Sequence, residues 1–234
     1  MRPAAVNGPP DVDVPAGGTA MVERLAAPRA EPRRDGEAPD DEVLARILEV
    51  ATTVPDHGGL RPWRFVVVRG SGRDRFGQAL VDGLHEQRGS GLPDAVVAKM
   101  RQKAYAAPCC VVLVASPDPE ANVPVWEQEA SAACTGYAVV LAAHALGFGA
   151  VWKSAATVDA PAVRRFFGLV DRERLLGWVN LGTPRTPSSR SRAETSRPAL
   201  GEVVTVVGDD GPRPLVTPIA ESAAAPPEAD GPSR

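Results

Sequence analysis

The amino-acid sequence predicts an α+β fold, in which helices and strands are mixed without regular alternation. Three apolar runs have the length and composition of buried strands: Phe65–Arg69 and Cys109–Ala115, which are rich in valine, and Arg174–Gly182. The helical segments between them do not produce the repeated strand–helix–strand order of a doubly wound parallel sheet. We therefore expect an irregular three-layer sandwich.

Helices are expected where apolar residues recur at three- and four-residue spacing. The first begins at Asp40, whose carboxylate suits the free N–H groups of a helix start, and ends near Thr53. A second is expected around residues 76–84, and a third covers Asp94–Lys103.

The longest expected element is a helix over Trp126–Leu146, in which almost every residue is small or apolar. A helix that is apolar on all sides must be buried, so we expect it at the centre of the fold or at a subunit interface. Near its start, Glu127 and Glu129 are interpreted as charges that complement the helix dipole. His144, near its end, is interpreted as a packed or dipole-compensating histidine.

The segments after this helix contain several turn and cap signals. Gly147 and Gly149 are expected to end the helix in left-handed geometry, before a short strand. Asp159 is expected to cap a further helix, which Gly168 stops. A last extended piece is expected over Val203–Val207.

A tight turn that contains a histidine precedes the first strand, in the sequence VPDHGGLRPWRF. Asp56 can bond back to the backbone, and Gly58 and Gly59 allow positive φ angles. Such a turn exposes backbone N–H groups that anions or flat polar ligands can use. The alternative is an ordinary helix-to-strand connection that leaves His57 at the surface.

Charge and cysteine content restrict the class of protein. The formal net charge is −3, which does not point to nucleic acid or to an anionic membrane as a partner. No apolar run reaches the roughly 18 residues that span a bilayer, and the first residues lack the apolar core of a secretory signal. Cys109 and Cys110 are neighbours on a strand and should point to opposite faces as buried thiols. We expect a protein of the reducing cytoplasm.

The composition predicts one folded domain between two disordered ends. Residues 1–37 form a mostly disordered N-terminal extension, residues 38–207 the folded domain, and residues 208–234 a disordered tail rich in Pro, Ala and Gly. Met21 opens a plainer sequence, and we expect it to be the natural start.

The sequence carries none of the common catalytic or nucleotide-binding motifs. It has no GxGxxG or GxxxxGK[ST] loop, no HExxH or Cys-x-x-Cys pair and no GxSxG elbow, and its three histidines are scattered. We therefore assign no catalytic side chain and no metal site. This pattern is typical of a binding or structural protein, or of an enzyme whose cofactor carries the chemistry.

Four segments in the same order and spacing carry a resemblance to a known family. They are VPDH…RPWRF at 54–65, VPVWEQE at 123–129, GFGAVWKS at 147–154 and LGTP at 181–184. Over roughly residues 28–185 the chain resembles the nitroreductase-like flavoproteins, and among them the small YdjA-type bacterial NAD(P)H nitroreductases.

The resemblance implies a three-layer α/β/α sandwich with a mostly antiparallel central sheet. It also implies a homodimer with FMN at the interface, where each flavin touches both chains. The activity implied is transfer of hydride from NADH or NADPH to an electron-poor acceptor, such as a nitroaromatic, a quinone or an enone. Because both substrates would use one pocket in turn, ping-pong kinetics are expected.

The resemblance also implies residues that bind the cofactor. The turn before the first strand borders the flavin, and His57 contacts it. Trp152, Lys153 and Ser154 form a second contact segment, in which Lys153 is a partner for the phosphate or the pyrimidine. Arg197 corresponds to a late basic position that reaches the phosphate in some members.

The chain departs from the family pattern at the phosphate site. The family's Arg-Arg-Ser motif aligns with Pro28-Arg29-Ala30, so that one arginine and the hydroxyl are missing. Thr53 stands where close relatives have an arginine that also helps to bind the cofactor, and Arg61 replaces the usual glutamine before Pro-Trp. Other arginines that could compensate are Arg24, Arg33 and Arg34.

Two further function classes remain open at this point. The chain could bind or remodel flavin without ordinary turnover, or it could be a dimeric interaction module that has lost FMN. Oxidation of NAD(P)H with a nitro acceptor separates the enzyme from both, and flavin content separates the two from each other.

Overall fold

The computed structural model describes residues 16–27, 29–185, 198–209 and 211–215. The chain divides into two compact units, Met1–Ser189 and Arg190–Arg234. The first unit holds a four-stranded sheet and six helices among its described residues, and the second holds a short helix and a hairpin.

The sheet of the first unit is antiparallel throughout. Its strands lie in the order β1-β2-β4-β3, and each of the three neighbouring pairs runs antiparallel. This confirms an α+β fold with an antiparallel sheet. The strands are β1 Trp63–Arg69, β2 Cys109–Ala115, β3 Gly149–Lys153 and β4 Arg174–Gly182.

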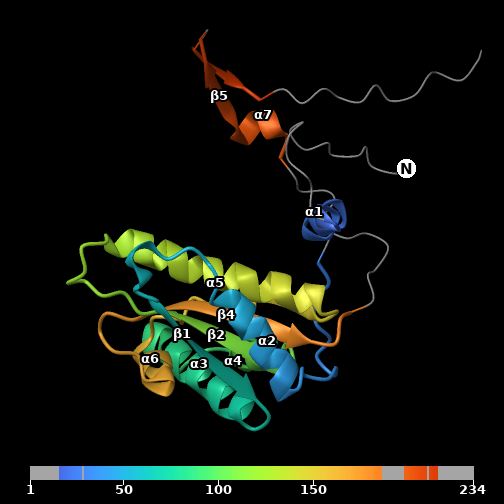
Figure 1. Ribbon diagram of the computed structural model, residues 1–234. Helices are drawn as coiled ribbons and strands as arrows, with labels where there is room; N and C mark the ends of the chain where they lie inside the picture. Colours follow the sequence, from blue (N-terminus) through green and yellow to red (C-terminus); the bar gives the residue numbers. More distant parts are fainter. Residues whose placement is uncertain (1–15, 28, 186–197, 210, 216–234) are drawn as a thin grey trace, which may run out of the picture. The chain divides into compact units, whose positions relative to one another are not determined.

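Helices of the first unit cover both faces of this sheet, as Figure 1 shows, whereas the first helix, Gly18–Ala26, buries no residue. In chain order they are α1 Gly18–Ala26, α2 Asp41–Ala51, α3 Gly72–Arg88, α4 Asp94–Arg101, α5 Val125–Ala145 and α6 Pro161–Phe167. Two short 3₁₀ turns, His57–Gly59 and Gln102–Tyr105, complete the described elements of the first unit apart from loops. In the part of the chain that the structure describes, no helix is both long and apolar enough to cross a membrane.

Alternating side chains of β2 divide the core into two halves. Val111 faces α2 and α5, where it lies in one cluster with Ile47 and Val139. Val112 faces α3 and α6, in a second cluster that includes Trp178. This alternation is the period-2 pattern of a strand that is buried on both faces.

Cys109 and Cys110 follow the same alternation and confirm the prediction of two buried thiols on opposite faces. Burial raises the pKa of Cys109 to about 11 and that of Cys110 to about 12. Both thiols therefore stay protonated and unreactive at neutral pH.

Most of the expected elements appear with bounds close to those predicted. Three details differ, two in the first unit and one in the second. Gly147 has the expected positive φ of 86°, but Gly149 is a residue of β3, where an added Cβ would lie 2.8 Å from the carbonyl oxygen of Glu31. Asp159 does not cap α6, because the cap position is Ala160 and the N–H of Ala162 donates to Glu86 of α3.

The second unit consists of α7 Leu200–Val203 and the antiparallel hairpin of β5 Thr205–Gly208 and β6 Gly211–Pro214. The extended piece expected over Val203–Val207 therefore begins two residues later, because Val203 ends a short helix. The helix α1 and the strand β6 lie within the terminal segments 1–37 and 208–234, and the expected domain 38–207 spans the division between the units. Those domain boundaries stay a prediction.

Candidate functional site

The N-terminal segment that follows α1 runs along the free edge of β3. The N–H of Ala150 donates to the carbonyl of Ala30 at 3.0 Å, and the N–H of Arg185 donates to the carbonyl of Glu31 at 2.8 Å. Gly149 allows this approach, since any side chain there would collide with the backbone of Pro32. Arg29 and Ala30 are thereby brought next to β3.

The end of β3 supplies the cation of the predicted site. The Nζ of Lys153 lies 3.2 Å from Oε1 of Glu31, and both side chains are about half exposed, at 49% and 55%. Ser154 follows the strand and is exposed. An exposed pair of this kind is screened by water and weakly held, so Lys153 can exchange Glu31 for another anion.

The side chain of Trp152 is packed into the fold. Its indole Nε1 donates to the carbonyl of Leu176 at 3.1 Å, and its ring fills the space next to Gly136 of α5, where an added Cβ would lie 2.8 Å from it. The indole therefore joins β3 to α5, and only the backbone of Trp152 is placed to meet a ligand.

Arg29 is joined to the middle of α5. Its Nη2 donates to the hydroxyl of Tyr137 at 2.7 Å and to the carbonyl of Leu25 at 3.0 Å. Its guanidinium carbon also lies 5.2 Å from the centre of the Tyr137 ring, within cation–π range. The sequence does not predict Tyr137 as a site residue. Its partner Arg29 lies 108 positions earlier in the chain, so no local pattern connects the two residues.

Of the three arginines expected to compensate at the phosphate site, Arg24 lies at the C-terminal end of α5. Its Nη2 donates to the carbonyls of His144 and Ala145 at 2.9 and 3.0 Å, where it completes the C-terminus of the helix. Arg33 instead pairs with Asp35, and Arg34 donates to Gln102.

His144 is packed at the end of α5, in agreement with one of the two interpretations of it. Its Nε2 is buried and has no hydrogen-bond partner among the described residues. Burial lowers the pKa of His144, and the charges of Arg29 and Arg24 lower it further. The imidazole is therefore neutral at physiological pH.

The histidine-bearing turn is fastened to the start of α5. Nδ1 of His57 lies 2.9 Å from Oε2 of Glu127, and the hydroxyl of Ser131 donates to the carbonyl of Pro55. The His57 side chain is 69% exposed, so its Nε2 edge is open to a ligand. Glu127 thus has a specific partner 70 positions away, which no local pattern could reveal.

The backbone of this turn has the predicted conformation. Gly58 and Gly59 have φ angles of 80° and 66°, and Asp56 accepts a hydrogen bond from the N–H of Arg61 at 2.6 Å. Arg61 itself has a φ of 48°, the one positive value at a non-glycine residue in the described ranges. Such a conformation costs about 1 kcal/mol or more and persists when the surroundings hold it.

Thr53 lies at the end of α2, four residues before His57. Its hydroxyl donates back to the carbonyl of Val50 at 2.9 Å. The side chain is exposed, and its oxygen can still accept a hydrogen bond.

The predicted residues form two groups. We call Arg29, Ala30, Trp152, Lys153 and Ser154 the β3-edge group, and Thr53 and His57 the turn group. Their contacts on α5, Tyr137 and Glu127, are ten residues apart, which is about 15 Å along a helix. Within one chain, the β3-edge group and the turn group therefore do not form a single contact cluster. Arg197 lies outside the described residues.

Between these contacts α5 carries an exposed apolar face. Trp126 is 68% exposed and Tyr137 50% exposed, and Ala130 and Cys134 lie at the intervening four-residue steps. Within one chain α5 packs against the sheet and α2 and leaves this face exposed, so it is not central on all sides, and its expected place at a subunit interface stays a prediction. An exposed apolar stripe of this length marks an interaction surface.

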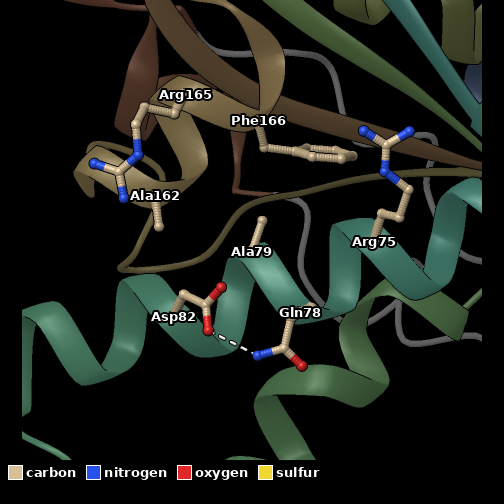
Figure 2. Close-up of a pocket in the computed structure, with 7 residues that line it drawn as sticks. All are labelled: Arg75, Gln78, Ala79, Asp82, Ala162, Arg165 and Phe166. Carbon is tan, nitrogen blue, oxygen red and sulfur yellow. Dashed lines mark hydrogen bonds between the residues drawn. The ribbon is translucent and has the colours of Figure 1, made fainter.

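A cavity of about 400 Å³ lies between α3 and α6, on the other face of the sheet (Figure 2). Its two arginines are already engaged: Arg75 stands over the Phe166 ring at 5.7 Å, and Arg165 pairs with Glu86 at 3.0 Å. Figure 2 also shows the hydrogen bond from Gln78 to Asp82. The residues that line this cavity include none of the predicted site residues.

Comparisons with known proteins identify the family and the fold of the chain. The model of the Nitroreductase family matches residues 35–183, which include β1 to β4 and the turn group. The chain is 38% identical over 172 residues to the Escherichia coli K12 protein named "Putative NAD(P)H nitroreductase YdjA", covering 73% of this chain and 90% of the relative.

Solved structures share the fold at lower sequence identity. A nitroreductase-like family protein from Bacillus cereus has a TM-score of 0.64 at 20% identity, over 80% of this chain and 95% of that one. The FMN-dependent nitroreductase NfnB from Mycobacterium smegmatis, solved in complex with NADPH, has a TM-score of 0.59 at 21% identity, over 80% and 97%.

Proposed function

Because this chain belongs to the nitroreductase family, we propose that it is an FMN-dependent oxidoreductase that passes hydride from NADH or NADPH to an electron-poor acceptor. The acceptors proposed are nitroaromatics, quinones and enones. The names of two similar proteins support both halves of this proposal, since one is named as a putative NAD(P)H nitroreductase and the other is an FMN-dependent nitroreductase solved with NADPH.

The observation that carries the proposal is the separation of the two residue groups along one exposed apolar helix face. Each group is half of a flavin site. A two-fold pairing of chains through α5 would bring the turn group of one chain towards the β3-edge group of the other, because an isologous interface exchanges the two ends of the same surface. We therefore propose a homodimer with FMN at the interface.

The residues present suit a flavin. The half-exposed cation of Lys153 and the exposed guanidinium of Arg29 can hold negative charge on the pyrimidine or the phosphate. The turn at Gly58 and Gly59 places backbone beside His57, and the N–H of Gly59 donates within the turn to the carbonyl of Asp56 at 3.2 Å. When bound, FMN supplies the chemistry of accepting hydride and donating it again.

The chain's own part in the reaction is to position the cofactor and to control charge. Lys153 would hold negative charge on a bound flavin ring, and Glu127 holds the orientation of His57 through Nδ1, which would leave Nε2 to meet the flavin. We assign no general acid or base. The donor and the acceptor would use one open face in turn, which gives ping-pong kinetics.

Anaerobic stopped-flow of the holoprotein separates the two half-reactions. We expect NADH or NADPH to bleach the visible absorbance of the flavin, and a nitroaromatic added afterwards to restore it. Steady-state rates at several acceptor concentrations should give parallel double-reciprocal plots. If neither NADH nor NADPH reduces the flavin, the protein binds flavin but lacks the proposed activity.

A further inference from the structure

The contact between Arg29 and Tyr137 suggests how this chain replaces a missing phosphate ligand. The pair joins a member of the β3-edge group, Arg29, to a residue of α5 that is 108 positions away in the sequence. Position 30 is alanine and offers no hydroxyl. We propose that the Tyr137 hydroxyl and the Arg29 guanidinium together hold the phosphate of FMN, an inference that rests on the proposed function.

The hydrogen-bond pattern leaves both groups able to donate. Nη2 of Arg29 donates both of its protons, one to Leu25 and one to the Tyr137 oxygen. The phenol is the acceptor of that bond, so its own O–H proton is free to donate. The guanidinium carries three further N–H groups, on Nη1 and Nε. Several donors thus stand at one point, as a phosphate monoester requires.

Both side chains are accessible from outside the chain. Arg29 is exposed, and Tyr137 is 50% exposed although it lies in the middle of a helix with a buried opposite face. A phosphate could therefore reach the pair without any rearrangement of the core. The same hydrogen bond that presents the phenol also orders the long Arg29 side chain, which reduces the entropy cost of binding.

The surrounding charge favours an anion at this position. Arg24 satisfies the carbonyls of His144 and Ala145, so that the negative end of α5 is covered by a cation. The nearby carboxylate of Glu31 is already compensated by Lys153.

The comparison of FMN with riboflavin tests the inference, because the two differ only in the phosphate. The apoprotein and its Tyr137→Phe variant are titrated with each flavin, and binding is followed by quenching of flavin fluorescence. We expect Tyr137→Phe to weaken FMN about tenfold or more, the loss of one hydrogen bond to a charged group, and to leave riboflavin unchanged.

The chain offers a matched control in Tyr105, its one other tyrosine. The Tyr105 hydroxyl donates to Asp74, far along the chain from α5, so Tyr105→Phe should leave both affinities unchanged. Arg29→Ala should also weaken FMN alone. The double variant with Tyr137→Phe should lose less than the sum of the two single losses, since the two groups act on one phosphate.

The outcomes separate this inference from the proposed function. If the wild type binds FMN and riboflavin equally well, or if Tyr137→Phe weakens both flavins to the same extent, the phosphate role of Tyr137 is wrong and the flavin function stands. If the wild type binds neither flavin, both are wrong.

Discussion

Lys153 shares its charge with Glu31, and this pairing sets how strongly the lysine can hold a cofactor. The two side chains are each about half exposed and 3.2 Å apart, so the pair contributes little to stability. Any anion that binds Lys153 must displace the Glu31 carboxylate or share the lysine with it. The pair therefore works against cofactor binding by a small amount.

Replacing Lys153 and replacing Glu31 should change FMN affinity in opposite directions. We expect Lys153→Ala to weaken FMN binding roughly tenfold, because it removes a charge-assisted contact. Glu31→Gln should strengthen binding by up to about fivefold, since it frees the lysine from a competing carboxylate. Titration of each apoprotein measures both effects, and an unchanged affinity in Lys153→Ala would remove Lys153 from the site.

Contacts between residues that are far apart in the sequence could not be predicted from the sequence. His57 was identified from its turn, but its partner Glu127 was interpreted as a charge that complements the helix dipole. Tyr137 was not identified at all. Hydrogen bonds between residues 70 and 108 positions apart depend on how α5 is placed against the rest of the fold, and no local pattern encodes that placement.

At the scale of elements, one ion pair fixes the loop between α6 and β4. The guanidinium of Arg64 on β1 donates through Nε and Nη2 to both carboxylate oxygens of Glu173, each at 2.7 Å. The Glu173 carboxylate also accepts from the N–H of Val170, and Arg164 donates to the carbonyls of Glu173 and Val170. These bonds tie the loop to the sheet.

The ion pair between Arg64 and Glu173 should make the free energy of unfolding depend on pH in the acidic range. The hydrogen bonds from Arg64 lower the pKa of Glu173 to about 2, and its side chain is only 6% exposed. Because the pKa is lower in the folded state than the ordinary value of about 4.3, the pair's stabilisation is complete above that pH. It is lost as the pH falls from about 5 towards 2.

Urea unfolding of Glu173→Gln measures this contribution. At pH 7 the variant should lose on the order of 2 kcal/mol of unfolding free energy, and below pH 3 its deficit should shrink. Asp35→Asn is the control, because its exposed pair with Arg33 should leave the unfolding free energy unchanged. A deficit that is constant from pH 7 to pH 2 would contradict the role given to the Glu173 charge.

The strands were the most predictable elements. The bounds of β2 and β4 agree with the apolar runs that predicted them, because a strand buried on both faces has a continuous apolar sequence. The cap of α6 was not predictable, since its hydrogen bond comes from Glu86 on another helix rather than from Asp159. The order of the strands also depends on long-range pairing, and it was not predicted: the resemblance implies only that the sheet is mostly antiparallel.

At the scale of the whole molecule, α5 is the element through which the proposed dimer would complete the proposed flavin sites. Its covered face packs so closely on the sheet that Gly136 has no room for a side chain beside Trp152. Its other face exposes Trp126 and Tyr137 and carries the contacts of both residue groups. A second copy of the chain on this face would both bury the apolar stripe and complete two flavin sites.

The visible absorbance of the freshly purified protein tests the central claim most directly. The sample is precipitated with acid, and the flavin released into the supernatant is identified and quantified against the protein. We predict a yellow protein that releases about one FMN per chain. A protein that is colourless as purified and stays colourless after incubation with excess FMN would contradict the flavin site proposed for α5 and the edge of β3.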